Sequence, residues 1–169
     1  HIGLMLINAG SMVFLFLSFK RLFNSMTGLI AAGFYGLMSI TYNVLGFAAH
    51  ATHFSVFYVS MALFFFAKYE EKKTKLLAFL FGFMLGMSFL MKQQAVYFIL
   101  FGGIVFLLFG IIERPINKKQ LIINTTLYSV GVFIPYIIVL LIMFVSGTFD
   151  KFWFWTVQYA SKYASGLPW

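Results

Sequence analysis

The sequence predicts an all-α integral membrane protein, a bundle of about six transmembrane helices in a single domain. Hydrophobic residues make up 62% of the 169 residues and charged residues only 9%, whereas a soluble domain carries about 25% charged residues. The mean hydropathy is +0.95, and charged clusters divide the chain into apolar stretches of the length that a bilayer core requires. A soluble nucleic-acid-binding protein is therefore excluded, although the formal charge of +8 alone would suit one.

Each apolar stretch ends at a polar or charged cluster. The first ends at Lys20 and Arg21, and the third ends at the charged run 68–75. The fourth ends at Lys92 and the fifth before Glu113. The length of the stretches and the lack of alternation between polar and apolar residues favour helices over strands. The six predicted spans are residues 2–19, 27–47, 52–67, 76–91, 95–112 and 121–145.

The basic residues predict the orientation of the spans. If the spans alternate in direction, the loops 20–26, 68–75 and 113–120 share one side and hold nine of the twelve Lys and Arg residues. Cytoplasmic loops collect Lys and Arg, so this side is predicted to be cytoplasmic and His1 to lie outside. An outside start without a signal peptide is typical of an internal fragment. We therefore expect residues 1–169 to be one transmembrane segment of a longer polypeptide, with a further helix upstream of this chain.

Two rows of small residues predict where helices pack closely. Lipid gives helices no hydrophobic reason to associate, so small side chains at four-residue spacing mark faces where backbones approach. A path for substrate is the alternative interpretation. Pro135 lies inside the sixth span and predicts a kink there. The two rows are Gly28, Ala32 and Gly36 in the second span, and Ala78, Gly82 and Gly86 in the fourth.

Two histidines mark the outer mouth of the third span. His50 and His53 are three residues apart, so on a helix they would share a face. Imidazole is a common metal ligand and, when protonated, pairs with anions, so one interpretation is a contact to a divalent metal or to a phosphate. The other is a pair of interfacial histidines hydrogen-bonded to water, because no carboxylate stands nearby to complete a metal site.

Lys92 is an exception to the predicted excess of basic residues on the cytoplasmic side. It stands between two apolar spans on the outer side, where basic residues are scarce. Ionisable residues at a membrane boundary usually face a cavity or a polar partner. With Gln93 and Gln94 beside it, Lys92 would suit a phosphate group, the ammonium acting as a point charge and the amides as donors. The alternative is a lysine at a helix end that extends its ammonium into water.

The segment 148–169 is rich in aromatic residues. Phe152, Trp155, Tyr159 and Tyr163 recur at spacings of three and four, which predicts one face of a helix lying in the membrane interface. An aromatic belt explains such residues at this depth, and saccharide stacking is the alternative.

Asp150 is the only acidic residue predicted on the outer side. It is a candidate base or ligand of a metal or substrate. It would equally pair with Lys151 or Lys162, or stabilise a helix as an acid in its first turn.

Two longer elements carry a family resemblance. The first comprises residues 29–34 and 46–54, and the second is the run 82–94, which contains Gly82, Gly86 and Lys92. Together with the pattern of spans and loops they resemble the multi-spanning GT-C glycosyltransferases of the protein mannosyltransferase and aminoarabinose transferase type.

The resemblance implies transfer of a sugar from a polyprenyl-phosphate-linked donor to a hydroxyl of a glycan, lipid or protein acceptor. The active site would face the periplasm or exterior of the plasma membrane, which for a bacterium is the inner membrane. The family's general base is an Asp in the first large external loop, expected upstream of His1, so this chain alone is expected to be inactive. Lys92 matches the family's lysine and, with Gln93, would bind the donor phosphate, while His50 and His53 occupy a loop that often holds a polar site residue.

Other function classes are compatible with the same sequence features. A transporter or flippase would share the small-residue helices but would place polar or charged groups near mid-membrane, where this sequence has almost none. An O-antigen polymerase or ligase would share the lipid-linked donor, with Arg-rich external loops in its favour. A purely structural subunit would leave His50, His53, Lys92 and Asp150 dispersed, so their convergence in one cavity would discriminate an enzyme from it.

Overall fold

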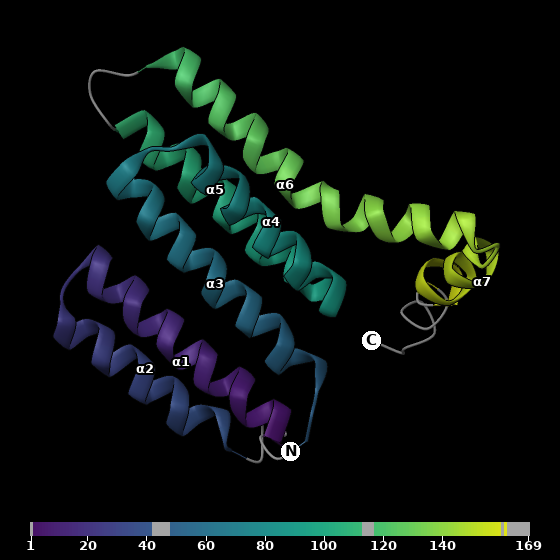
Figure 1. Ribbon diagram of the computed structural model, residues 1–169, viewed down its shortest axis with the longest axis horizontal. Coiled ribbons are helices and arrows are strands. Elements are labelled where there is room, and N and C mark those ends of the chain that lie inside the picture. Colours follow the sequence, from purple (N-terminus) through teal and green to yellow (C-terminus); the bar gives the residue numbers. More distant parts are fainter. Residues whose placement is uncertain (1, 42–47, 113–116, 160, 162–169) are drawn as a thin grey trace, which may run out of the picture. The chain divides into compact units, whose positions relative to one another are not determined.

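The computed structural model describes residues 2–41, 48–112, 117–159 and 161, and every regular element in that part of the chain is a helix. The predicted all-α class is confirmed. The helices α1 to α4 run side by side in alternating directions, with α3 between α1 and α4 (Figure 1). The elements are α1 (Ile2–Leu22), α2 (Ser25–Ser39), α3 (Ala51–Lys72), α4 (Lys75–Met91), the 3-10 turn η2 (Gln93–Ala95), α5 (Val96–Ile112), α6 (Lys118–Val145), α7 (Phe149–Trp153) and the π-helical η3 (Phe154–Tyr159).

Four helical segments are long and apolar enough to cross a bilayer: α1, α3, the stretch Gln93–Ile112 and α6. The other two helices of the bundle are shorter, 17 residues in α4 and 15 in α2. The predicted second span, 27–47, is helical only to Ser39, and residues 42–47 lie outside the described part. At the end of α2, two side-chain hydroxyls bind backbone carbonyls of the last turn. Ser39 Oγ donates to Gly36 O and Thr41 Oγ1 donates to Met38 O, each at 2.9 Å.

The third helix continues beyond its predicted end at residue 67. The charged residues that follow still favour a helix, since Lys and Glu are good helix formers. Lys73 ends α3 in the left-handed conformation, with φ of 49°, and its N–H donates to Tyr69 O at 2.7 Å. The apolar stretch ends at residue 67, and the helix itself ends five residues later, at Lys72.

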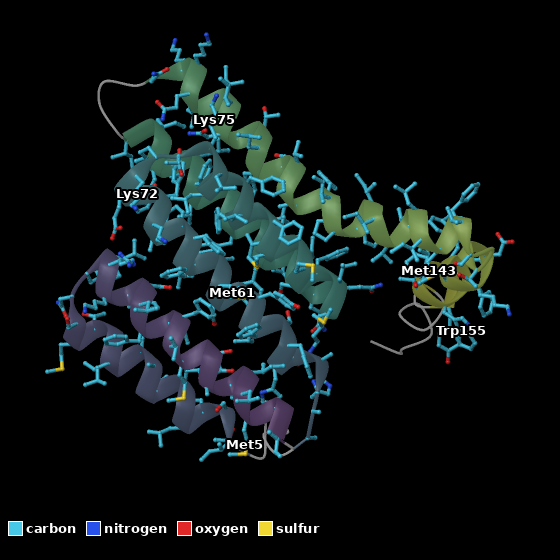
Figure 2. The ribbon with its side chains drawn as sticks, viewed as in Figure 1. Met5, Met61, Lys72, Lys75, Met143 and Trp155 are labelled. Carbon is cyan, nitrogen blue, oxygen red and sulfur yellow. The ribbon has the colours of Figure 1, made fainter. Side chains whose placement is uncertain are left out.

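The ends of α1 and α3 and the starts of α4 and α6, which carry the basic residues of the predicted loops 20–26, 68–75 and 113–120, lie at one end of the bundle, called the basic end; Lys72 and Lys75 are labelled there in Figure 2. Arg21 Nη1 at the end of α1 binds both carboxylate oxygens of Glu71 at the end of α3, at 3.0 and 3.1 Å. Gln120 Nε2 in α6 donates to Lys73 O at 3.4 Å. The described residues of the basic end are Lys20, Arg21, Lys68, Lys72, Lys73, Lys75, Lys118 and Lys119.

The first small-residue row packs on α1. A Cβ on Gly28 would overlap the carbonyl oxygen of Phe16, and one on Gly36 would lie 2.9 Å from the Met12 side chain. The row therefore confirms close helix packing between α2 and α1.

The second row brings α4 against α6. A Cβ on Gly82 would overlap the Tyr128 carbonyl oxygen, and one on Gly86 would overlap that of Val132. Gly131 approaches the α4 backbone from the other side of the same contact. Neither helix has room for a side chain here.

The chain divides into two compact units, residues 1–135 and 136–169, each described by itself. The division falls within α6, directly after Pro135, and the predicted kink at this proline stays a prediction. In the second unit Gly147, with φ of 65°, follows α6, and Thr148 N–H donates back to Met143 O at 3.0 Å.

The aromatic tail of the second unit forms two short helices. The rings of Trp155 and Tyr159 lie 5.2 Å apart, while the Phe152 ring lies 6.5 Å from that of Tyr136. Residues 149–159 are helical, as predicted, with π-helical geometry in η3. The position of this helix in the membrane interface stays a prediction. Tyr163 lies outside the described residues.

Candidate functional site

Lys92 occupies the junction between α4 and α5. Its backbone leaves the helix in an extended conformation, with φ of −155° and ψ of 120°, while its N–H still donates to Ser88 O at 3.1 Å. The next turn, η2, begins at Gln93 and bonds back through Ala95 N–H to Lys92 O at 2.9 Å. This tight connection fixes Lys92 and Gln93 at the end of the bundle opposite the basic end.

The Lys92 side chain reaches back to α3. It is half-buried, and its Nζ donates to Thr52 Oγ1 at 2.8 Å. An ammonium group has three donor hydrogens, so Thr52 occupies one of them. Lys92 is therefore held against the start of α3 and is not simply extended into water.

His50 caps the N-terminus of α3. Its Nδ1 accepts from Thr52 N–H at 3.3 Å and lies 2.8 Å from Thr52 Oγ1. Because Lys92 only donates to Thr52 Oγ1, the Thr52 hydroxyl has its own hydrogen left to donate to His50 Nδ1. These contacts assign the His50 ring proton to Nε2, the nitrogen outside the network.

His53 belongs to a second, buried network. Only 4% of its surface is exposed, and its Nδ1 lies 3.2 Å from Asn8 Oδ1 in α1. The Tyr35 hydroxyl of α2 donates to the same Asn8 oxygen at 3.1 Å. Since Asn8 Oδ1 only accepts, the His53 proton is assigned to Nδ1. His53 Nε2 is buried and has no hydrogen-bond partner among the described residues.

The two histidines thus hold different positions, and their contacts favour opposite tautomers. His50 is exposed and precedes the helix, whereas His53 is buried in its first turn. The described residues contain no group of three or more His, Asp or Glu side chains that could hold a metal ion.

Asp150 belongs to the second unit. It is exposed and stands in the first turn of α7, the position in which an acid favours a helix. Within the described part of this unit no ion pair joins it to Lys151, and Lys162 lies outside the described residues.

The structure brings together Lys92 and His50 through Thr52, and it places His53 in a neighbouring network with Asn8. Sequence reasoning missed Thr52 and Asn8, together with Tyr35. An amide inside an apolar span was the available signal for Asn8, because lipid offers it no hydrogen-bond partner.

Comparison with known proteins gives one finding. A family model described as dolichyl-phosphate-mannose-protein mannosyltransferase matches residues 1–158. No curated protein and no solved structure matches the chain.

Proposed function

This chain belongs to the dolichyl-phosphate-mannose-protein mannosyltransferase family, and from that premise we propose that it transfers a sugar from a polyprenyl-phosphate-linked donor to an acceptor hydroxyl at the outer face of the membrane. The match over residues 1–158 makes the protein a multi-pass membrane glycosyltransferase of the GT-C type. Membership also favours this function over transport and over O-antigen polymerisation or ligation. The acceptor would be a glycan, a lipid or a protein.

In the proposed reaction the acceptor oxygen attacks the anomeric carbon of the sugar. The bond between that carbon and the phosphate oxygen breaks, and its electron pair leaves on the lipid phosphate. A carboxylate takes the proton of the acceptor hydroxyl. Negative charge grows on the leaving phosphate, so a fixed cation beside it stabilises the transition state more than the ground state.

The observation that carries this proposal is the position of Lys92. Its ammonium is held 2.8 Å from Thr52 Oγ1 at the end of the bundle opposite the basic end. Two of its hydrogens remain for phosphate oxygens, and Gln93 begins the exposed turn beside it. We place the donor phosphate on Lys92 and Gln93.

His50 joins this site as a donor. With Nδ1 engaged by Thr52, the Nε2–H of His50 is left to bind an oxygen of the phosphate or the sugar. A metal role for His50 or His53, and a role of Asp150 as base or ligand, stay predictions.

The placement of the acidic residues bears on the general base. Glu70 pairs with Lys73 at 2.9 Å, and Glu71 pairs with Arg21 at 3.0 Å, both at the basic end. Neither carboxylate is near the Lys92 end of α4. Following the family resemblance, we propose that the base is an Asp of an external loop upstream of His1 and that residues 1–169 alone do not catalyse transfer. Asp150 is the alternative base within this chain.

The experiment replaces Lys92 in the product of the gene that encodes this chain. Lys92→Ala is expected to lower kcat/KM by about a hundredfold in a membrane transfer assay, the usual cost of losing one group that stabilises developing negative charge. Lys92→Arg keeps the charge and is expected to recover part of the activity.

Lys20→Ala is the matched control, because it removes a lysine from the basic end, where Lys20 Nζ lies 5.7 Å from the Phe16 ring centroid. Normal transfer by Lys92→Ala, or an equal loss in Lys20→Ala, would count against a phosphate role for Lys92.

A further inference from the structure

The basic end contains a polar cavity that the proposed transfer does not use. It measures about 400 Å³ and lies between the α3–α4 connection and the first turns of α6. This volume is in the range of small-molecule sites. Three lysines line it, Lys73, Lys75 and Lys119, together with Asn117 and Gln120.

The cavity carries uncompensated positive charge. Lys73 is paired with Glu70 at 2.9 Å. Lys75 and Lys119 have no acidic partner in the described part of the chain. A ligand with a negative charge is therefore favoured, and a phosphate group suits two ammonium groups acting as point charges.

Two helices begin at this cavity. The Thr74 side chain makes no cap hydrogen bond to α4, so the first amides of α4 keep donor capacity. In α6, Asn117 Oδ1 accepts from Gln120 N–H at 3.1 Å. The partial positive charge of both helix N-termini adds to that of the lysines and favours an anion.

Asn124 gives an independent indication of a ligand. Its side chain is fully buried and lines the same cavity. Its Nδ2 donates to the Tyr69 hydroxyl at 2.8 Å, while its Oδ1 has no partner among the described residues. An unpaired buried acceptor is costly, and a ligand hydroxyl would satisfy it.

We propose that this cavity binds the headgroup of an anionic phospholipid of the phosphatidylglycerol class. The phosphodiester would contact Lys75 and Lys119, and a glycerol hydroxyl would donate to Asn124. Two exposed apolar side chains favour a lipid over a free phosphate. Leu76 follows Lys75 and is 64% exposed, and Ile122 lies one helical turn after Lys119 and is 67% exposed. The acyl chains of the lipid would lie against this apolar surface. Basic pockets between transmembrane helices are suited to anionic headgroups.

The test is native mass spectrometry of the purified chain supplied with equal amounts of phosphatidylglycerol and phosphatidylcholine that carry the same acyl chains. The unmodified chain is expected to retain phosphatidylglycerol preferentially. The double variant Lys75→Gln/Lys119→Gln is expected to lower that preference by about thirtyfold, since each lysine near an anionic lipid contributes roughly fivefold.

The control Lys20→Gln/Lys68→Gln removes the same charge from the basic end outside the cavity, and it is expected to keep the preference. Equal losses in the two double variants would overturn the proposal, because they would indicate attraction to the overall charge. Displacement of the lipid by an equal concentration of inorganic phosphate would overturn it in favour of a phosphate-ion site.

Discussion

Lys92 Nζ lies 2.8 Å from Thr52 Oγ1, across the contact between α4 and α3. Because the ammonium only donates, the Thr52 hydroxyl directs its own hydrogen to His50 Nδ1, 2.8 Å away. The hydrogen bonds therefore run from Lys92 to Thr52 and from Thr52 to His50. Thr52 positions both the Lys92 ammonium and the His50 ring.

We predict that Thr52→Val lowers the free energy of unfolding by about 2 kcal/mol, because it removes a hydrogen bond to a charged group. It should also reduce sugar transfer, since Lys92 loses its anchor. Thr125→Val is the control: the Thr125 hydroxyl is buried and has no partner among the described residues, so its removal should be neutral or stabilising. Thermal unfolding in detergent compares the two, and equal stability changes would contradict the role of Thr52.

Asn8→Ala is predicted to be more destabilising than Tyr35→Phe. Asn8 Oδ1 accepts from both Tyr35 and His53, so its loss leaves two donors unpaired, at a cost of about 2 to 3 kcal/mol. Tyr35→Phe removes one donor and keeps the Asn8–His53 contact, at about 1 kcal/mol. The midpoints of thermal unfolding show which variant is less stable. A lower midpoint for Tyr35→Phe than for Asn8→Ala would show that Asn8 does not link α1 to α2 and α3.

Gly82→Ala is predicted to disrupt the contact between α4 and α6, because its Cβ would overlap a backbone carbonyl that has no freedom to rotate away. We expect a loss of about 3 kcal/mol. Gly33→Ala adds the same methyl group in α2, where no atom lies within 4 Å, and should leave stability unchanged or slightly higher. Unfolding in detergent distinguishes them, and similar midpoints would refute the close approach.

The proposed orientation can be tested directly because the chain contains no cysteine. Gln94→Cys, in the α4–α5 connection, is expected to react with a membrane-impermeant maleimide added outside intact cells. Thr74→Cys, in the preceding connection, should react only after the membrane is opened. Labelling of Thr74→Cys alone in intact cells would reverse the orientation and place Lys92 in the cytoplasm.

The sequence predicted the helices well where charge ends an apolar stretch, and less well elsewhere. Lys92 marks the junction of α4 and α5 in both prediction and structure. The predicted third span ends at residue 67 because hydropathy detects the end of the apolar stretch, whereas the helix propensity of residues 68–72 extends α3 to Lys72. The second helix ends at Ser39 although the sequence stays apolar beyond it, so hydropathy does not register this boundary.

The site was predictable only in part, for a similar reason. Lys92 stood out because it opposes the charge bias, but its partner Thr52 is 40 residues away. Asn8 and His53 are 45 residues apart and meet only once α1 packs on α3. The spacing of His50 and His53 suggested a shared face, yet capping places His50 outside the helix and gives the two rings different partners.

The glycine contact between α4 and α6 also bears on how the protein assembles during synthesis. These two helices touch through their backbones although α5 separates them in the sequence. When α5 enters the bilayer, the surface of α4 around Gly82 and Gly86 is still uncovered, and it stays so until α6 has been synthesised and inserted. This part of the bundle can therefore close only after the sixth span has been synthesised, and a chain that ended before α6 would leave the Gly82 and Gly86 surface of α4 without its partner helix.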